Sequence, residues 1–124
     1  MNTELATHCK SRTYQKDTGC GHIYIIICYY SIAEKEGRIE QILINGDKEN
    51  ACGNSFFNTL ADDLTYMVRR IRNKFEAIAI CKNYRYHRCN KIKPNKDHVV
   101  SCVDAIGQVL QNELGVTDDE IWGR

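Results

Sequence analysis

The strongest strand signal in the chain is the stretch Ile23-Tyr24-Ile25-Ile26-Ile27-Cys28-Tyr29-Tyr30. Its β-branched and aromatic residues are apolar on both faces, and the run is too short for a typical helix. We therefore predict that it forms a buried central strand. Residues Arg12 to Lys16 alternate weakly and predict an edge strand, and Arg38 to Ile44 predict a further strand that ends at an Asn45-Gly46 turn signal.

Two amphipathic helices are predicted after these strands. Apolar residues recur at helical spacing from Phe57 to Ile71, and either Asn54 or Ser55 can cap the start of this helix. The second helix is predicted from about Ser101, which resembles the start of a capping box, to Leu114. Gly115 is a natural residue to end it.

A group of strands followed by helices indicates the α+β class, with a small antiparallel sheet and helices packed on one face. The chain of 124 residues suits a single domain. Residues 75–81 fit either a short helix or a strand. We expect residues 1–10 to be loosely ordered, residues 11–115 to form the domain, and residues 116–124 to be an acidic tail with Trp122 as a possible anchor.

The composition excludes several classes of protein. Hydrophobic residues make up 43 % and charged residues 27 % of the chain, which is typical of a globular protein and not of a disordered one. The net charge of +1 argues against a general nucleic-acid coat, because such proteins are strongly basic. The sequence contains no apolar run long enough to span a bilayer and no apolar core of a signal peptide, so we expect no membrane partner and a cytoplasmic location.

The chain has seven cysteines but no C-x-x-C pair. In a reducing compartment such cysteines are free thiols, and we expect most of them to be buried. A metal site assembled from cysteines far apart in the sequence is the alternative.

Positive charge is concentrated in residues 82–98, which hold six Lys or Arg and one Asp. Arginines of this segment can grip a phosphate group through two parallel hydrogen bonds, its tyrosines can stack on a base, and its asparagine can read a polar edge. These residues are Tyr84, Arg85, Tyr86, Arg88 and Asn90, and Asn54 before the long helix is a further polar candidate. The alternative is a solvated basic loop whose tyrosines are anchored in the core.

A second basic group is formed by Arg69, Arg70 and Arg72, which are predicted in the last turn of the long helix. Cations are favoured there by the helix dipole, which is the simpler explanation. Three arginines in four residues exceed what the dipole requires. The alternative is therefore that at least one of them joins the basic segment around one phosphate-bearing ligand.

Little in the sequence indicates catalysis. No G-x-S-x-G, H-E-x-x-H or G-x-G-x-x-G motif occurs, so we name no catalytic residue, expect neither metal nor cofactor, and do not interpret the chain as an enzyme.

Five short pieces, in order, resemble the TSCPD domain, a module of vitamin-B12-dependent ribonucleotide reductases. They are Thr18-Gly19-Cys20-Gly21, Glu36-Gly37-Arg38-Ile39, Cys52, Tyr86-His87-Arg88-Cys89 and Ser101-Cys102-Val103-Asp104-Ala105-Ile106. Val103 stands where the signature of that domain has proline. The resemblance covers residues from about 11 to 114.

Among proteins of this type, the chain most resembles the stand-alone Thoeris anti-defence proteins of phages, type one. That resemblance implies a homo-oligomer, a dimer or larger, that sequesters a cyclic ADP-ribose isomer or related cyclic nucleotide in the host cytoplasm without cleaving it. One alternative is an accessory module of a ribonucleotide reductase complex, with zinc held by Cys20, Cys52, Cys89 and Cys102. A weaker one is a binder of single-stranded nucleic acid that uses Tyr84 and Tyr86.

Overall fold

The computed structural model describes residues 9–18, 21–32, 35–46, 53–85 and 101–122. Its sheet has three antiparallel strands, β1 (Cys9–Asp17), β2 (His22–Ile32) and β3 (Lys35–Gly46), in the order β1-β2-β3. The predicted central strand is therefore confirmed as β2, and both predicted neighbours are confirmed but longer. Strand β2 ends later and strand β3 begins earlier than the sequence indicated, and Ile32 pairs with Lys35.

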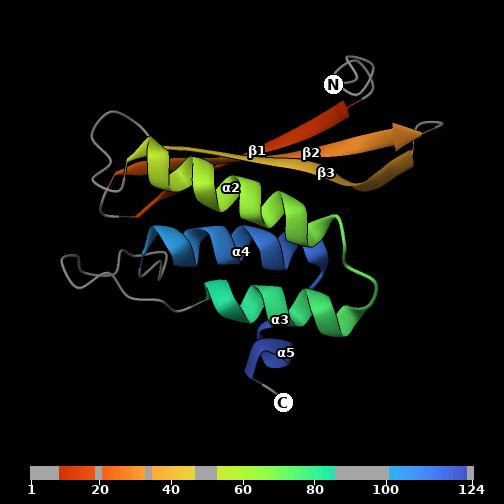
Figure 1. Ribbon diagram of the computed structural model, residues 1–124. Coiled ribbons are helices and arrows are strands. Elements are labelled where there is room, and N and C mark those ends of the chain that lie inside the picture. The colour runs from red at the N-terminus through yellow and green to blue at the C-terminus, as the bar shows by residue number, and fades with distance from the viewer. Residues whose placement is uncertain (1–8, 19–20, 33–34, 47–52, 86–100, 123–124) are drawn as a thin grey trace.

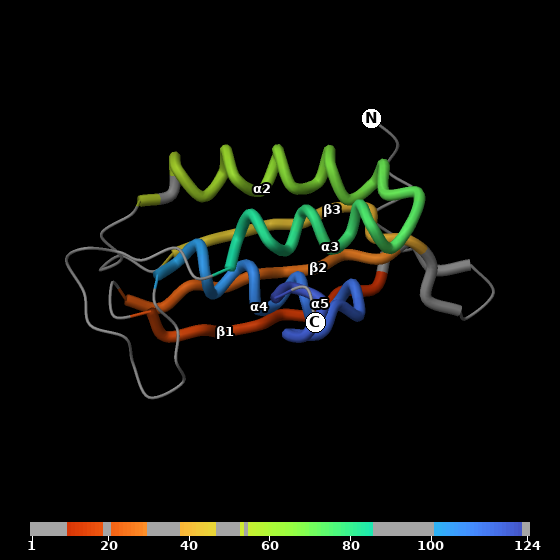
Figure 2. Tube along the Cα trace, turned by 90° about the horizontal axis from the view of Figure 1, so that it is seen from below, coloured from red at the N-terminus to blue at the C-terminus, as the bar shows by residue number. Residues whose placement is uncertain are grey.

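Four helices lie in the described part of the chain. They are α2 (Asn54–Val68), α3 (Lys74–Tyr84), α4 (Cys102–Leu114) and α5 (Asp118–Trp122). All of them lie on the same side of the sheet, with α2 and α4 next to the strands and α3 and α5 beyond α4 (Figure 1). Seen from below, α2 follows β3 while α4 lies over β1 and β2 (Figure 2). The predicted α+β fold with helices on one face is confirmed.

The core lies between the sheet and the first helix layer. Ile23, Ile25 and Ile27 of β2 are at most 1 % exposed and pack with Phe57 and Leu64 of α2, which are fully buried. The alternate residues of β2, such as Ile26, are only half-buried. The run Ile23–Tyr30 is thus apolar on both faces, but the described residues cover only one of them.

A bulge shifts the alternation within β3. Ile42 and Ile44 face the core, and so does Ile39, although it is three residues before Ile42. The pairing changes register between Cys28 and Tyr29, where an extra residue of β3 is accommodated. The bulge keeps Ile39 on the buried face, next to Arg38 in the sequence.

The ends of the two long helices differ in how well they were predicted. The N-cap residue of α2 is Gly53, with φ of +78° and no side-chain hydrogen bond to the helix, so the predicted cap at Asn54 or Ser55 is wrong. The start of α4 is as predicted, because the Ser101 hydroxyl accepts from the Asp104 backbone N–H at 3.0 Å. Gly115 ends that helix in the left-handed conformation, also as predicted.

Other boundaries required correction. Helix α2 ends at Val68, so Arg69, Arg70 and Arg72 follow the helix and do not lie within its last turn. Residues 75–81 belong to a helix, α3, and the alternative of a strand is excluded.

The C-terminal segment is anchored in the core by Val116 and Ile121, and not by Trp122. Ile121 is 7 % exposed and Val116 is 4 % exposed, whereas Trp122 is 58 % exposed. Both buried side chains join the main core cluster. Within the described ranges, no helix has the length and apolar character needed to cross a membrane.

Candidate functional site

Two hollows open near the connection between α2 and α3. The larger, of about 760 Å³, lies between the end of α2 and the first turns of α3. The smaller, of about 470 Å³, lies between the ends of α2 and α4 and the sheet. Arg38 and Ile71 line both hollows, so the two are neighbours separated by these side chains.

The larger hollow combines an apolar floor with a cationic rim. The floor is made by Met67, Ile71, Ala79 and Ile80. The rest of the lining consists of three arginines, one tyrosine and one glutamate, which are Arg38, Arg70, Arg72, Tyr66 and Glu76. This excess of positive charge favours an anionic ligand, and the ring offers a flat surface beside it.

Arg70 and Tyr66 form one unit at the rim. The guanidinium carbon of Arg70 lies 3.6 Å from the centre of the Tyr66 ring, and its Nη1 donates to the Tyr66 backbone carbonyl at 3.0 Å. Residues four apart on a helix are neighbours, which explains this stacking although Arg70 lies just past the end of α2. Tyr66 is 61 % exposed, so the stacked pair faces solvent.

Arg72 is held near the same rim by Glu76. The Arg72 backbone N–H donates to Glu76 Oε1 at 2.8 Å, and its Nη2 donates to Oε2 at 3.3 Å. The backbone and side-chain hydrogen bonds from Arg72 lower the pKa of the Glu76 carboxyl. This exposed pair is weak, so a phosphate group can compete with the carboxylate for the guanidinium.

Arg38 sits at the wall between the hollows. Its Nη2 donates to the Arg69 carbonyl at 2.6 Å, which satisfies one backbone group at the end of α2. The Arg69 guanidinium is directed elsewhere, to Glu40 of β3 at 3.7 Å, and does not line either hollow. Of the predicted arginine group, Arg70 and Arg72 therefore face a cavity and Arg69 does not.

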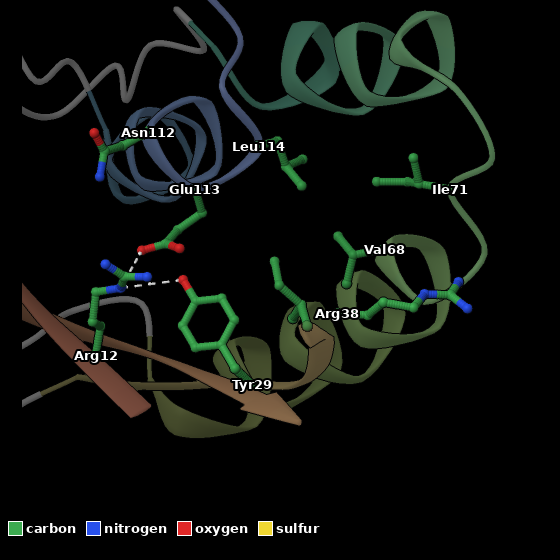
Figure 3. A pocket seen from close by; sticks show the side chains of 9 residues that line it. Arg12, Tyr29, Arg38, Val68, Ile71, Asn112, Glu113 and Leu114 are labelled. Atoms are coloured by element: carbon green, nitrogen blue, oxygen red, sulfur yellow. Dashed lines mark hydrogen bonds and ion pairs between the residues drawn. The ribbon is translucent and has the colours of Figure 1, made fainter. Parts of the chain in front are cut away.

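The smaller hollow is built around a buried carboxylate. Arg12 of β1 lies between Glu113 of α4 and Tyr29 of β2 (Figure 3). Its Nε is 3.4 Å from Glu113 Oε2 and 3.3 Å from the Tyr29 hydroxyl, and its guanidinium lies over the Tyr29 ring at 4.9 Å. The Glu113 side chain is 4 % exposed and that of Arg12 is 49 % exposed.

A second tyrosine holds the same carboxylate. The Tyr14 hydroxyl donates to Glu113 Oε2, and Asn112 Nδ2 donates to the Tyr14 oxygen at 2.8 Å. Burial and, next, the bond to Glu113 raise the pKa of Tyr14. These contacts fix Glu113 in one orientation at the edge of the hollow.

The described part of the basic segment lies at the other end of α3. Tyr84 is 9 % exposed, and burial raises the pKa of its hydroxyl. The Arg85 side chain is also 9 % exposed, and its Nε binds Asp104 Oδ1 at 2.9 Å. Its Nη1 contacts Gln111 and lies 3.4 Å from Asp118. Arg85 therefore joins α3 to α4, so the described part of the basic segment (residues 82–85) does not line the two hollows.

The remaining predicted site residues lie outside the described residues. These are Tyr86, Arg88 and Asn90, together with the side chain of Asn54. Their roles stay predictions.

The cysteines were predicted as free and mostly buried. Among the described side chains, Cys81 and Cys102 are buried and Cys28 is half-buried, and none of these three forms a disulfide. Of the four proposed zinc ligands only Cys102 is described, and its sulfur lies 3.2 Å from the Thr18 hydroxyl. No cluster of His, Cys, Asp or Glu suited to a metal occurs in the described ranges.

Sequence reasoning missed Arg38, Tyr66, Arg12 and Glu113. A signal existed for Tyr66, because it stands four residues before Arg70 on the exposed side of the predicted helix. The others come from three separate strands or helices, and only the folded topology brings them together.

Comparison with protein families matches the TSCPD domain over residues 3–114. No curated protein and no solved structure matches the chain. Because the match spans most of the sequence, this chain belongs to the TSCPD domain family.

Proposed function

We propose that this chain binds a phosphate-bearing nucleotide in the larger hollow, and that it sequesters a cyclic ADP-ribose-type signal without cleaving it. One observation supports the binding site above all others. Three arginines and an exposed tyrosine line a hollow with apolar residues, and its lining includes a single acidic residue.

The size and chemistry of the hollow suit such a ligand. Small-molecule pockets range from about 300 to 1,000 Å³, and they combine apolar walls with a few well-placed polar groups. A hollow of about 760 Å³ falls within this range. Arginine binds phosphate oxygens through two parallel hydrogen bonds, so Arg70 and Arg72 can hold a doubly charged diphosphate once the phosphate displaces Glu76 from Arg72.

The ring of the ligand has a place beside the phosphates. Tyr66 and Arg70 form a stacked, solvent-facing pair, and a purine can stack on either of the two flat groups. The biological role, the capture of an immune signal by a phage protein, comes from the resemblance to the Thoeris anti-defence proteins.

The proposal is tested by incubating the purified protein with the product of an activated TIR-domain enzyme. We expect the signal to disappear from the free pool after filtration and to return with unchanged mass once the protein is denatured by heat. A product of altered mass would show that the protein is an enzyme.

Failure to deplete the signal would refute the proposed role. Stoichiometric zinc in such a protein, lost on Cys89→Ser, would then favour the accessory module of a ribonucleotide reductase complex.

A further inference from the structure

We infer that the smaller hollow is the sugar subsite of the same ligand, with Glu113 accepting hydrogen bonds from the hydroxyl groups of a ribose. This inference rests on the proposed function of the larger hollow. It adds a chemical requirement, because the ligand must then carry a neutral, hydroxylated ring next to its phosphates.

The two hollows can hold one molecule because they share a wall. Arg38 and Ile71 contribute to both linings. In Figure 3 the guanidinium of Arg38 points away from Arg12, past Val68, so the side chain spans the wall from the smaller hollow outward. A phosphate group bound near Arg38 would leave the next group of the ligand at the mouth of the smaller hollow.

The charges of the smaller hollow indicate a neutral guest. Apart from the shared Arg38, its lining has one cation, Arg12, and one carboxylate, Glu113, which are paired at 3.4 Å. Their charges cancel, so a second phosphate would find no net attraction there. The apolar side chains of Val68 and Leu114 reach into the space between them and Arg38 (Figure 3).

Glu113 is positioned to accept hydrogen bonds from hydroxyl groups. Both Arg12 and Tyr14 bind its Oε2, and the second oxygen, Oε1, is turned towards the hollow (Figure 3). An ionised carboxylate only accepts hydrogen bonds, so its natural partners are donors such as ribose hydroxyl groups. A carboxylate holds ribose in this way in dinucleotide-binding sites of other folds.

The site also discriminates against ligands without the hydroxyl groups. The Glu113 side chain is 4 % exposed, and a ligand that covers Oε1 without donating to it would leave a buried acceptor unsatisfied. Sites built to bond a substrate hydroxyl reject the analogue that lacks it for this reason.

The test is calorimetric titration of the full chain with four probes. They are cyclic ADP-ribose, its analogues that lack the 2′- and 3′-hydroxyl groups of one or the other ribose, and inorganic pyrophosphate. For the unmodified protein we expect one analogue to bind at least tenfold more weakly than cyclic ADP-ribose. For Glu113→Gln we expect that difference to vanish, while pyrophosphate binds no more weakly than to the unmodified protein.

A second variant guards against a folding defect in the first. Leu114→Phe adds bulk to the smaller hollow and leaves Glu113 in the sequence. It should weaken the binding of cyclic ADP-ribose while leaving the binding of pyrophosphate intact. The sugar subsite alone would be overturned if both analogues bound the unmodified protein as tightly as cyclic ADP-ribose. It would also be overturned if the difference in affinity between cyclic ADP-ribose and the analogue survived in Glu113→Gln. Absence of binding by all probes would overturn the proposed function together with it.

Discussion

Replacement of Asp104 by asparagine tests whether Arg85 is a structural residue. The ion pair between them spans 2.9 Å, with the Arg85 side chain 9 % exposed and the Asp104 side chain fully buried. Removing one partner of such a pair leaves an uncompensated buried charge, at a cost of about 3–5 kcal/mol. Asp118 lies 3.4 Å from the same guanidinium and is 69 % exposed, so it can offset part of the loss. We therefore expect the lower end, about 3 kcal/mol.

The assay is urea unfolding followed by far-ultraviolet circular dichroism. For a domain of this size, with a slope of about 2 kcal/mol per molar urea, the midpoint should fall by about 1.5 M. Asp62→Asn, at an exposed position of α2, is the matched control and should leave the midpoint unchanged. The double variant Arg85→Met/Asp104→Leu should recover most of the loss, because an apolar pair of similar volume does not need a counter-charge. A loss below about 1 kcal/mol for Asp104→Asn would refute the structural role of Arg85.

Three further predictions concern the binding site and the core. Arg70→Gln should weaken binding of cyclic ADP-ribose at least tenfold in calorimetry, whereas Arg69→Gln should not, because only Arg70 lines the larger hollow. Gly107→Ala should lower the free energy of unfolding by about 1–3 kcal/mol, because its new methyl group would lie 2.5 Å from the Tyr84 carbonyl oxygen; an unchanged urea midpoint would contradict this close approach. Burial raises the pKa of the Cys81 thiol from 9.0 to about 11, so the unfolded thiol ionises first. Stability should therefore fall between pH 9 and 11 by at most about 2.7 kcal/mol, and the urea midpoint of Cys81→Ala should fall less over this range.

The elements predicted well are those with a dense local signal. The stretch from Ile23 to Tyr30 has no competing interpretation as a surface helix, and it forms the central strand. The helix α4 carries both its start and its stop in its own sequence, at Ser101 and Gly115, and both act as expected. Local rules suffice where all the partners lie within a few residues of each other.

The bulge in β3 and the ends of α2 show where local rules stop. The spacing of Ile39, Ile42 and Ile44 breaks strict alternation, which in hindsight indicates the extra residue. Helix α2 begins directly after Gly53, and the pattern of apolar residues does not reveal the positive φ of this glycine.

The candidate site was predicted only in part for a related reason. Arg70 and Arg72 were found because they are close in sequence, and both line the larger hollow. Arg38 reaches that hollow from β3, and pairing across 31 residues, as in its bond to the Arg69 carbonyl, leaves no local trace. Arg85 was predicted as a phosphate ligand by residue type, and no local pattern indicated its ion pair with Asp104, 19 residues away.

The most direct test of the binding site is a crystal structure of the protein with cyclic ADP-ribose. We predict that the diphosphate oxygens lie about 2.7–2.9 Å from the guanidinium nitrogens of Arg70 and Arg72, with the intact ligand between α2 and α3. A diphosphate bound away from both arginines, with the hollow between α2 and α3 empty, would contradict the account.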